Sequence, residues 1–274
     1  MLTREQRPLR PPHRTLLHAS IVVLVIVAAA AIVMSRVADD DDQRHDASRS
    51  APPSTSTTVQ SPPSTSDPDQ TLIATADVNH VAVYTDPASP TPTMSFPNPW
   101  FVNDDRNAAV ALVFNVEAQR PDGWLQVLLP IRPNGSTGWI HAADVTLVPT
   151  RYRVTVELAA HRLRVTNGPE ILLEDTVAVG APATPTPPGR YYIRALLQAP
   201  DPNTVYGPYA YGLSGHSDAL QTFNGGDAEV GIHGNNDPSV LGQDVTHGCI
   251  RMSNAAITTL TDLLPLGTPV VIRP

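Results

Sequence analysis

The sequence predicts a mainly β protein, with two β-rich units and one short helix near its end, preceded by a membrane-spanning helix and an unfolded linker. From about residue 71 onward, short runs of apolar and β-branched residues are separated by turn residues. Pro is abundant, with 29 of 274 residues, which disfavours a helical bundle. The stretch 15–35, in contrast, is almost wholly apolar, as a bilayer-spanning helix requires.

Composition excludes several classes of protein. The chain has 18 basic residues, all of them Arg, against 26 acidic residues, and its net charge is −8. It therefore lacks the basic face that nucleic-acid binding needs, and we expect no nucleic-acid partner. The single cysteine, Cys249, rules out both an internal disulfide framework and a thiolate-cluster zinc ribbon.

The N-terminal segment predicts a single-pass membrane anchor. Residues 1–14 hold four Arg and one acid, which is typical of a cytoplasmic tail, and a run of four Asp follows the apolar stretch at 39–42. As a helix, residues 15–35 extend about 30 Å, the thickness of a bilayer core. The rest of the chain then lies outside the cell membrane. A cleaved signal peptide stays open as the alternative, although its apolar region is normally shorter and Arg36 stands where a small residue is expected.

Residues 36–70 predict a disordered linker. They are mostly Ser, Thr, Pro, Asp and Gln, and 50–69 contains Pro-Pro twice with almost no apolar residue. Such a segment buries too little surface to offset the entropy of ordering. We expect it to act as a tether.

Residues 71–149 predict a small β-barrel, because short strands alternate with Pro-Asp-Gly at 121–123 and Pro-Asn-Gly at 133–135. The segment 123–140 resembles the closing hairpin of bacterial SH3-like domains, whose members often contact cell-wall peptides. Trp124 and Trp139 in this segment are equally consistent with core or edge aromatics. The expected strands are 81–84, 110–116, 124–129 and 138–140.

Residues 150–274 predict a second β-rich unit. Alternation over 152–158 indicates a half-buried strand, and Asn167-Gly168 between apolar runs indicates a hairpin. Ser253 is positioned to cap a helix over 254–264, and Pro265 and Gly267 end it. The other expected strands are 163–166, 171–173, 176–179, 191–197 and 270–272.

The residues around Cys249 indicate thiol catalysis, which needs a sulfur nucleophile, a base for its proton and donors for an oxyanion. His233 or His247 is a candidate base, and an ion pair with either would lower the thiol pKa. A small buried Cys is one alternative. A zinc site built from these three residues is another, but His-x-Cys is not a usual ligand spacing.

At this point the sequence resembles a known family. His233-Gly234 followed by Thr-His-Gly-Cys-Ile-Arg at 246–251, together with Thr-Pro-Pro-Gly at 186–189 preceded by a further Thr-Pro, looks like the signature of the YkuD-type L,D-transpeptidase catalytic domain. Gly-Pro-Tyr-Ala at 207–210 and His-Ser-Asp at 216–218 resemble actinobacterial members. The resemblance covers 151–274. Thr246 departs from the usual Ser, and Asn235 from a frequent Thr.

The resemblance implies a β-sandwich and a role for each matching residue. Cys249 would be the nucleophile and would form a thioester. His233 would accept and return its proton, oriented by the carbonyl of Gly234. His247 would support the site, and the N–H groups of Gly248 and Cys249 would stabilise the oxyanion.

The implied reaction is acyl transfer between peptidoglycan stem peptides, a donor and an acceptor, with release of D-Ala and formation of a 3→3 cross-link. Arg251 and Gly234 would lie in the substrate site, although a structural ion pair is an equally good reading of Arg251. We expect no metal and no organic cofactor. An L,D-carboxypeptidase and an inactive wall-binding membrane protein stay open as alternatives. The stretch 205–226 is the candidate lid.

Overall fold

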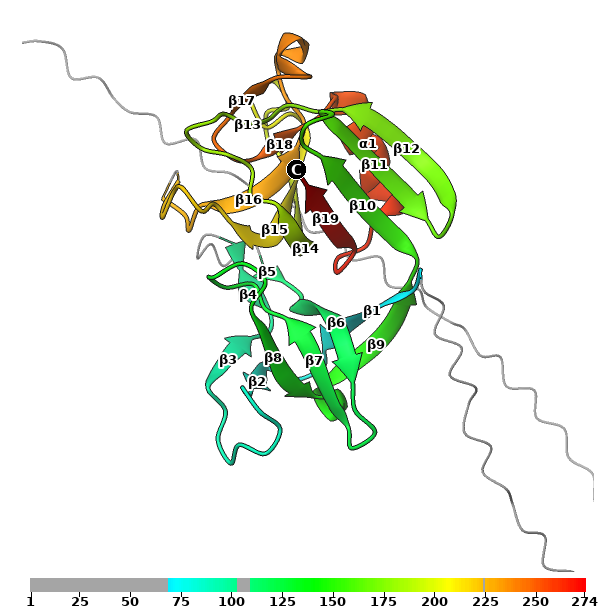
Figure 1. The fold of residues 1–274 in the computed structure, drawn as a ribbon, viewed down its shortest axis with the longest axis vertical. Helices are drawn as coiled ribbons and strands as arrows, with labels where there is room; N and C mark the ends of the chain where they lie inside the picture. The colour runs from blue at the N-terminus through cyan, green and yellow to red at the C-terminus, as the bar shows by residue number, and fades with distance from the viewer. Residues whose placement is uncertain (1–68, 103–108, 224) are drawn as a thin grey trace, which may run out of the picture.

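The computed structural model describes residues 69–102, 109–223 and 225–274, which form two β-rich units (Figure 1). The predicted tail, the predicted span at 15–35 and the linker up to residue 68 lie outside these ranges. Within the ranges that are described, no helix is long and apolar enough to cross a membrane. The anchor and its orientation therefore stay predictions.

The N-terminal unit is built on a five-stranded sheet in the order β8-β7-β6-β1-β9. Two short two-stranded ribbons, β2-β3 and β4-β5, and a 3-10 turn, η2 (Ala142–Asp144), are also described in it. The sheet strands are β1 (Thr71–Ala76), β6 (Val113–Gln119), β7 (Trp124–Leu128), β8 (Thr137–His141) and β9 (Val145–Thr150). The ribbon strands are β2 (His80–Val83), β3 (Met94–Pro97), β4 (Trp100–Phe101) and β5 (Ala109–Val110).

The two predicted turns of this unit are confirmed, because Gly123 and Gly135 both have positive φ, at 86° and 84°. Two strands of the sheet, β1 and β9, were not predicted. Pro149 in β9 obscures the strand pattern, yet β9 is an edge strand, where a missing N–H is tolerated. The assignment of this unit as SH3-like stays a prediction.

The C-terminal unit is built on an eight-stranded sheet in the order β12-β11-β10-β19-β14-β15-β16-β18, with the pair β13-β17 beside it. A 3-10 turn, η3 (Pro238–Val240), and one α-helix, α1 (Asn254–Leu263), are the helical elements described in this unit. The strands are β10 (Tyr152–Glu157), β11 (Arg162–Asn167), β12 (Glu170–Thr176), β13 (Val179–Gly180), β14 (Gly189–Gln198), β15 (Tyr209–His216), β16 (Glu229–His233), β17 (Asp244–Thr246), β18 (Ile250–Arg251) and β19 (Pro269–Arg273).

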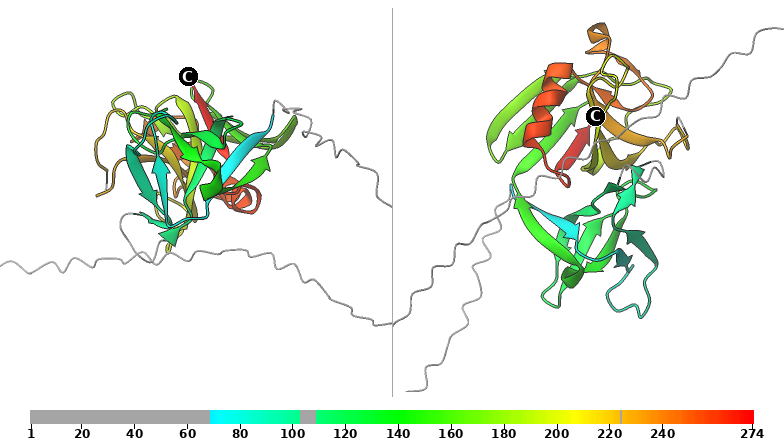
Figure 2. Two further views of the ribbon diagram at one scale, coloured as in Figure 1. Left: turned by 90° about the horizontal axis from the view of Figure 1, so that it is seen from below. Right: turned by 180° about the vertical axis from the view of Figure 1, so that it is seen from behind.

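The last strand, β19, lies inside the sheet rather than at its edge. It pairs in parallel with β10 and antiparallel with β14 (Figure 1). Helix α1 packs on one face of the sheet (Figure 2), and Ile257 and Leu260 are fully buried there. The predicted cap is confirmed, since the Ser253 hydroxyl accepts the Ala256 N–H at 3.2 Å. The hairpin at Asn167-Gly168 is also confirmed.

Two expectations for this unit hold only in part. The strand expected at 171–173 lies within β12, which continues to Thr176, and of the strand expected at 176–179 only Val179 belongs to a separate strand, β13. The candidate lid, 205–226, holds strand β15 in its centre, where Tyr211 and Leu213 are fully buried. The Gly, Ser and Tyr residues of β15 have weak strand patterning, and pairing with β14 and β16 overrides it.

The two units share a small apolar cluster. Asn115 of the N-terminal unit also donates a hydrogen bond to the carbonyl of Gly267 at 2.5 Å. The contact is therefore packed as well as polar, which favours a fixed arrangement of the units. The buried cluster residues are Ile73, Val113, Leu128 and Tyr192, with Leu266 packed against them.

Candidate active site

Two adjacent strands bring His233 and Cys249 to one place. Strands β16 and β18 are parallel, with His233 beside Arg251 in register. Cys249 directly precedes β18 and lies beside Gly231, whose added Cβ would be 3.9 Å from the Cys249 sulfur. Since side chains alternate along a strand, Cys249, Arg251 and His233 point to the same face. Residues 16 apart in sequence thus share one site.

The ring of His233 is buried and held by its own turn. The side chain is 3% exposed, and Nδ1 lies 2.7 Å from the carbonyl oxygen of Gly234. A carbonyl can only accept a hydrogen bond, so the neutral ring carries its proton on Nδ1 and leaves Nε2 as an acceptor. This is the contact that the resemblance implied for Gly234. The backbone of Val205 also bonds to the His233 ring, and the Tyr206 ring centroid lies 5.1 Å from that of His233.

Burial sets the charge of both groups. It lowers the pKa of His233 to about 4, against the opposing effect of the Gly234 carbonyl. Burial also raises the pKa of the Cys249 thiol, and neither the backbone of Gly231 nor the charge of Arg251 reverses that direction. Both directions oppose the resting ion pair, with a lowered thiol pKa, that the sequence predicted. They favour a neutral thiol and a neutral imidazole.

The backbone before Cys249 is fixed by Thr246. Its hydroxyl donates to the Cys249 carbonyl at 2.5 Å and accepts the Gly248 N–H at 3.1 Å. Gly248 has a φ of 114°, a conformation that favours glycine. The Gly248 N–H is thus already bonded to Thr246, which differs from the expected oxyanion donor. The Cys249 N–H is left as the candidate donor.

Two threonines that the sequence analysis did not assign also hold this loop. Thr186 is buried, donates to the Gly248 carbonyl at 2.9 Å and accepts the Gly180 N–H at 2.9 Å. Thr184 donates to the Thr246 carbonyl at 3.0 Å. Both belong to the Thr-Pro segment quoted for the resemblance, which was the available signal. Their position under the Cys249 loop comes from contacts across about sixty residues of chain.

His247 and Arg251 lie two residues before and two residues after Cys249 in the sequence. His247 is exposed, and its ring centroid is 5.3 Å from that of Phe223. Arg251 forms no salt bridge with any residue that the structure describes, and its buried Nε has no partner there. The structural ion pair is thus absent from the described chain, and the guanidinium is available to a carboxylate.

A small pocket opens next to Cys249. Its walls are mostly apolar, and Glu229 is its acidic residue. The lining residues are Ser217, Leu220, Phe223, Ala228, Glu229, Val230, His247, Gly248 and Cys249.

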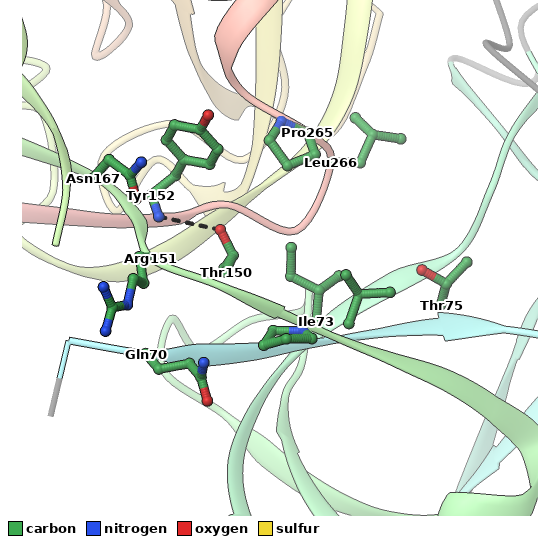
Figure 3. A pocket seen from close by; sticks show the side chains of 11 residues that line it. Gln70, Ile73, Thr75, Thr150, Arg151, Tyr152, Asn167, Pro265 and Leu266 are labelled. Carbon is green, nitrogen blue, oxygen red and sulfur yellow. Dashed lines mark hydrogen bonds between the residues drawn. The ribbon is translucent and has the colours of Figure 1, made fainter. Parts of the chain in front are cut away.

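A larger groove of about 430 Å³ lies elsewhere, at the junction of the two units (Figure 3). It is lined by residues such as Ile73, Tyr152 and Leu266, and the Tyr152 N–H donates to Thr150 Oγ1 at 3.1 Å on its wall (Figure 3). It shares no residue with the Cys249 pocket. The larger cavity is therefore not the one that contains the candidate nucleophile.

Comparison with known proteins gives matches centred on the C-terminal unit. The family model of the L,D-transpeptidase catalytic domain (YkuD) matches residues 151–272. The putative L,D-transpeptidase YkuD of Bacillus licheniformis is 31% identical over 156 residues, which are 54% of this chain and 86% of the relative. The protein of the same name from Bacillus subtilis is 31% identical over 122 residues, 44% of this chain and 66% of the relative.

Two solved structures are also similar. An L,D-transpeptidase from Mycobacterium smegmatis has 15% sequence identity and a TM-score of 0.37, over 59% of this chain and 82% of that chain. The catalytic domain of an Enterococcus faecium L,D-transpeptidase has 22% identity and a TM-score of 0.34, over 44% of this chain and 96% of that chain.

Proposed function

Since this chain belongs to the YkuD family of L,D-transpeptidase catalytic domains, we propose that it transfers acyl groups between peptidoglycan stem peptides. The observation that carries the proposal is the placement of Cys249 and His233 on one face of two paired strands. A nucleophilic sulfur, an imidazole that can take its proton and a nearby backbone N–H are the parts that thioester chemistry needs.

The first half-reaction forms the thioester. Cys249 Sγ attacks the carbonyl carbon between the L-centre of diaminopimelate and the terminal D-Ala, and the thiol proton passes to His233 Nε2. His233 then returns this proton to the nitrogen of D-Ala, which leaves as the C–N bond breaks. Because both groups rest neutral, proton transfer accompanies the attack rather than preceding it.

The second half-reaction forms the cross-link. The amine of a second stem peptide attacks the thioester carbonyl and loses its proton to His233. The C–S bond breaks and His233 protonates the departing sulfur, which restores the starting thiol. The new amide joins two third residues, a 3→3 link. The Cys249 N–H stabilises the oxyanion in both halves, and Arg251 binds a stem carboxylate.

Incubation of the purified protein with tetrapeptide muropeptides, followed by mass spectrometry, tests the proposal. We expect a dimer and free D-Ala. Cys249→Ala should abolish both, and His233→Gln should slow them by about 10²- to 10⁴-fold, the usual contribution of a general base. Trimmed monomer without dimer would assign an L,D-carboxypeptidase instead, and undiminished D-Ala release by Cys249→Ala would refute the thioester mechanism.

We also propose that the chain is anchored in the cell membrane by residues 15–35, with the N-terminus in the cytoplasm and the two units in the wall, and that the N-terminal unit is SH3-like. The support is the apolar stretch with its flanking charges and the hairpin at 123–140. Intact-mass analysis of the membrane fraction tests the anchor. A mature chain starting near Asp39 would contradict it.

A further inference from the structure

The wall of the Cys249 pocket is bonded to the N-terminal unit. Asn134, in the turn after β7, donates from Nδ2 to the His216 carbonyl at 2.8 Å, and its Oδ1 accepts the His216 N–H at 2.9 Å. One side chain thereby satisfies both backbone groups of the last residue of β15. The next residue, Ser217, lines the pocket.

Arg132, two residues before Asn134, holds the same wall at two further points. Its Nη2 donates to the carbonyls of Leu220, at 2.9 Å, and Asp227, at 3.1 Å. Leu220 lines the pocket directly, and Asp227 immediately precedes the lining residue Ala228. The Asp227 carboxylate adds a contact of 3.8 Å to Arg132.

A second chain of contacts joins the N-terminal unit to the pocket through Trp100. The Arg194 guanidinium lies 4.0 Å from the centre of the Trp100 ring, a cation–π contact between the two units. Arg194 Nη1 is 2.5 Å from Oε1 of Glu229, the acidic residue of the pocket. The Arg194 side chain is only 11% exposed, so this contact is shielded from water.

Both sets of contacts begin in the N-terminal unit and end on the wall of the pocket. The strand pairing there explains why outside partners are needed. Pairing of β14 with β15 stops at Leu213, so His216 lies beyond β14, although β16 still pairs with it on the other side. Asn134 supplies the partners that a neighbouring strand would otherwise give.

We propose that Arg132 and Asn134 are positioning residues for the active site, through which the N-terminal unit shapes the pocket beside Cys249 that receives the substrate. This inference rests on the proposed function for its substrate but not for its geometry. A loosened wall weakens contacts made equally in the ground state and the transition state, so it raises KM and leaves kcat nearly unchanged.

Asn134→Ala in the full chain tests the proposal, with Asn115→Ala as the matched control. Asn115 also bonds across the units to a backbone carbonyl, that of Gly267, but touches no pocket residue. We expect Asn134→Ala to raise KM for the tetrapeptide donor by about tenfold with kcat within about threefold, and Asn115→Ala to leave both within about twofold.

Hydrogen exchange of the peptide spanning 217–223 provides a readout independent of turnover. Exchange should quicken in Asn134→Ala and stay unchanged in Asn115→Ala. Arg132→Lys, which keeps the charge but loses the forked donors, should give an intermediate KM and intermediate exchange, and it serves if Asn134→Ala does not fold.

Unchanged exchange in both Asn134→Ala and Arg132→Lys overturns the inference, as does an equal rise of KM in the Asn115→Ala control. If the wild type does not act on stem peptides, the proposed function fails, and the exchange measurement still decides whether the N-terminal unit orders the wall.

Discussion

At the scale of single residues, burial rather than charge pairing governs the site. His233 is buried and Cys249 is partly buried, and the neutral form of each group is favoured as a result. The single thiol is then less prone to reaction in the absence of substrate, because the thiolate is the reactive species. In the proposed mechanism, His233 takes the proton as the attack begins.

The buried His233 predicts a pH-dependent stability with a defined sign. Its pKa is about 4 when folded and about 6.5 when unfolded, so the unfolded chain binds the extra proton as the pH falls. The contribution of His233 to the free energy of unfolding is fully present above pH 6.5. It decreases towards pH 4, by up to about 3 kcal/mol. Denaturant titrations of the wild type and His233→Gln across this range check it.

The comparison of the two proteins isolates His233, because other titrating groups, including the buried His216, are common to both. The wild type should lose more stability than His233→Gln between pH 6.5 and pH 4. Parallel curves would show that folding does not lower the pKa of His233.

At the scale of elements, the parallel pair β16-β18 and the Thr-Pro segment before β14 position different parts of the site. The strand pair sets which side chains share a face. The Thr-Pro segment holds the backbone of the Cys249 loop in place through hydrogen bonds of the Thr186 and Thr184 hydroxyls. Reactive geometry thus depends on an element that contributes no reacting group.

Thr186→Val should therefore disturb the site without removing volume. It leaves the Gly248 carbonyl and Gly180 N–H without their buried partner, at a cost of about 1–3 kcal/mol in stability. We expect kcat/KM to fall about ten- to a hundredfold as the sulfur shifts. Thermal melting and steady-state kinetics measure the two effects. Thr186→Ser keeps the hydroxyl and should stay near wild type, and a Ser variant as impaired as the Val variant would show that retaining the hydroxyl does not preserve the site.

At the scale of the whole molecule, the two units behave as one packed body. They share the apolar cluster around Ile73 and Tyr192, the Asn115 contact and the bonds from Asn134 and Arg132. The space is filled closely, since an added Cβ on Gly267 of the C-terminal unit would come within 2.3 Å of Ile73. We expect the units to unfold together.

Ile73→Ala should lower the free energy of unfolding by about 2–5 kcal/mol, because Ile73 is 4% exposed at this junction. Ile171→Ala is the matched control, and with 56% exposure it should cost about 0.5 kcal/mol or less. The three Trp residues all lie in the N-terminal unit, so their fluorescence follows that unit, while labelling of Cys249 follows the other. The two probes should give one shared midpoint in each variant, and separate midpoints would show that the units are independent.

Much of the fold followed from local patterns. The alternation at 152–158, the Asn167-Gly168 hairpin and the capped helix were predicted because each depends on neighbours in sequence. The strands β15 and β16 and the edge strand β9 were not, because distant partners stabilise them against weak local preference. The site shows the same contrast between local motifs and distant contacts. The motif identified Cys249 and His233 as candidates, but it gave Thr186 no role.

The sequence by itself determined the family, the proposed reacting groups and the expectation of two β-rich units after a linker, since these depend on residue chemistry and short-range spacing. Only the tertiary structure decided the charge states at the site, because burial is a property of the packed chain. It alone also paired Asn134 with His216, 82 residues away, and so joined the N-terminal unit to the pocket. A contact of that span leaves no periodic trace in the sequence, because its cause is the docking of one folded surface on another.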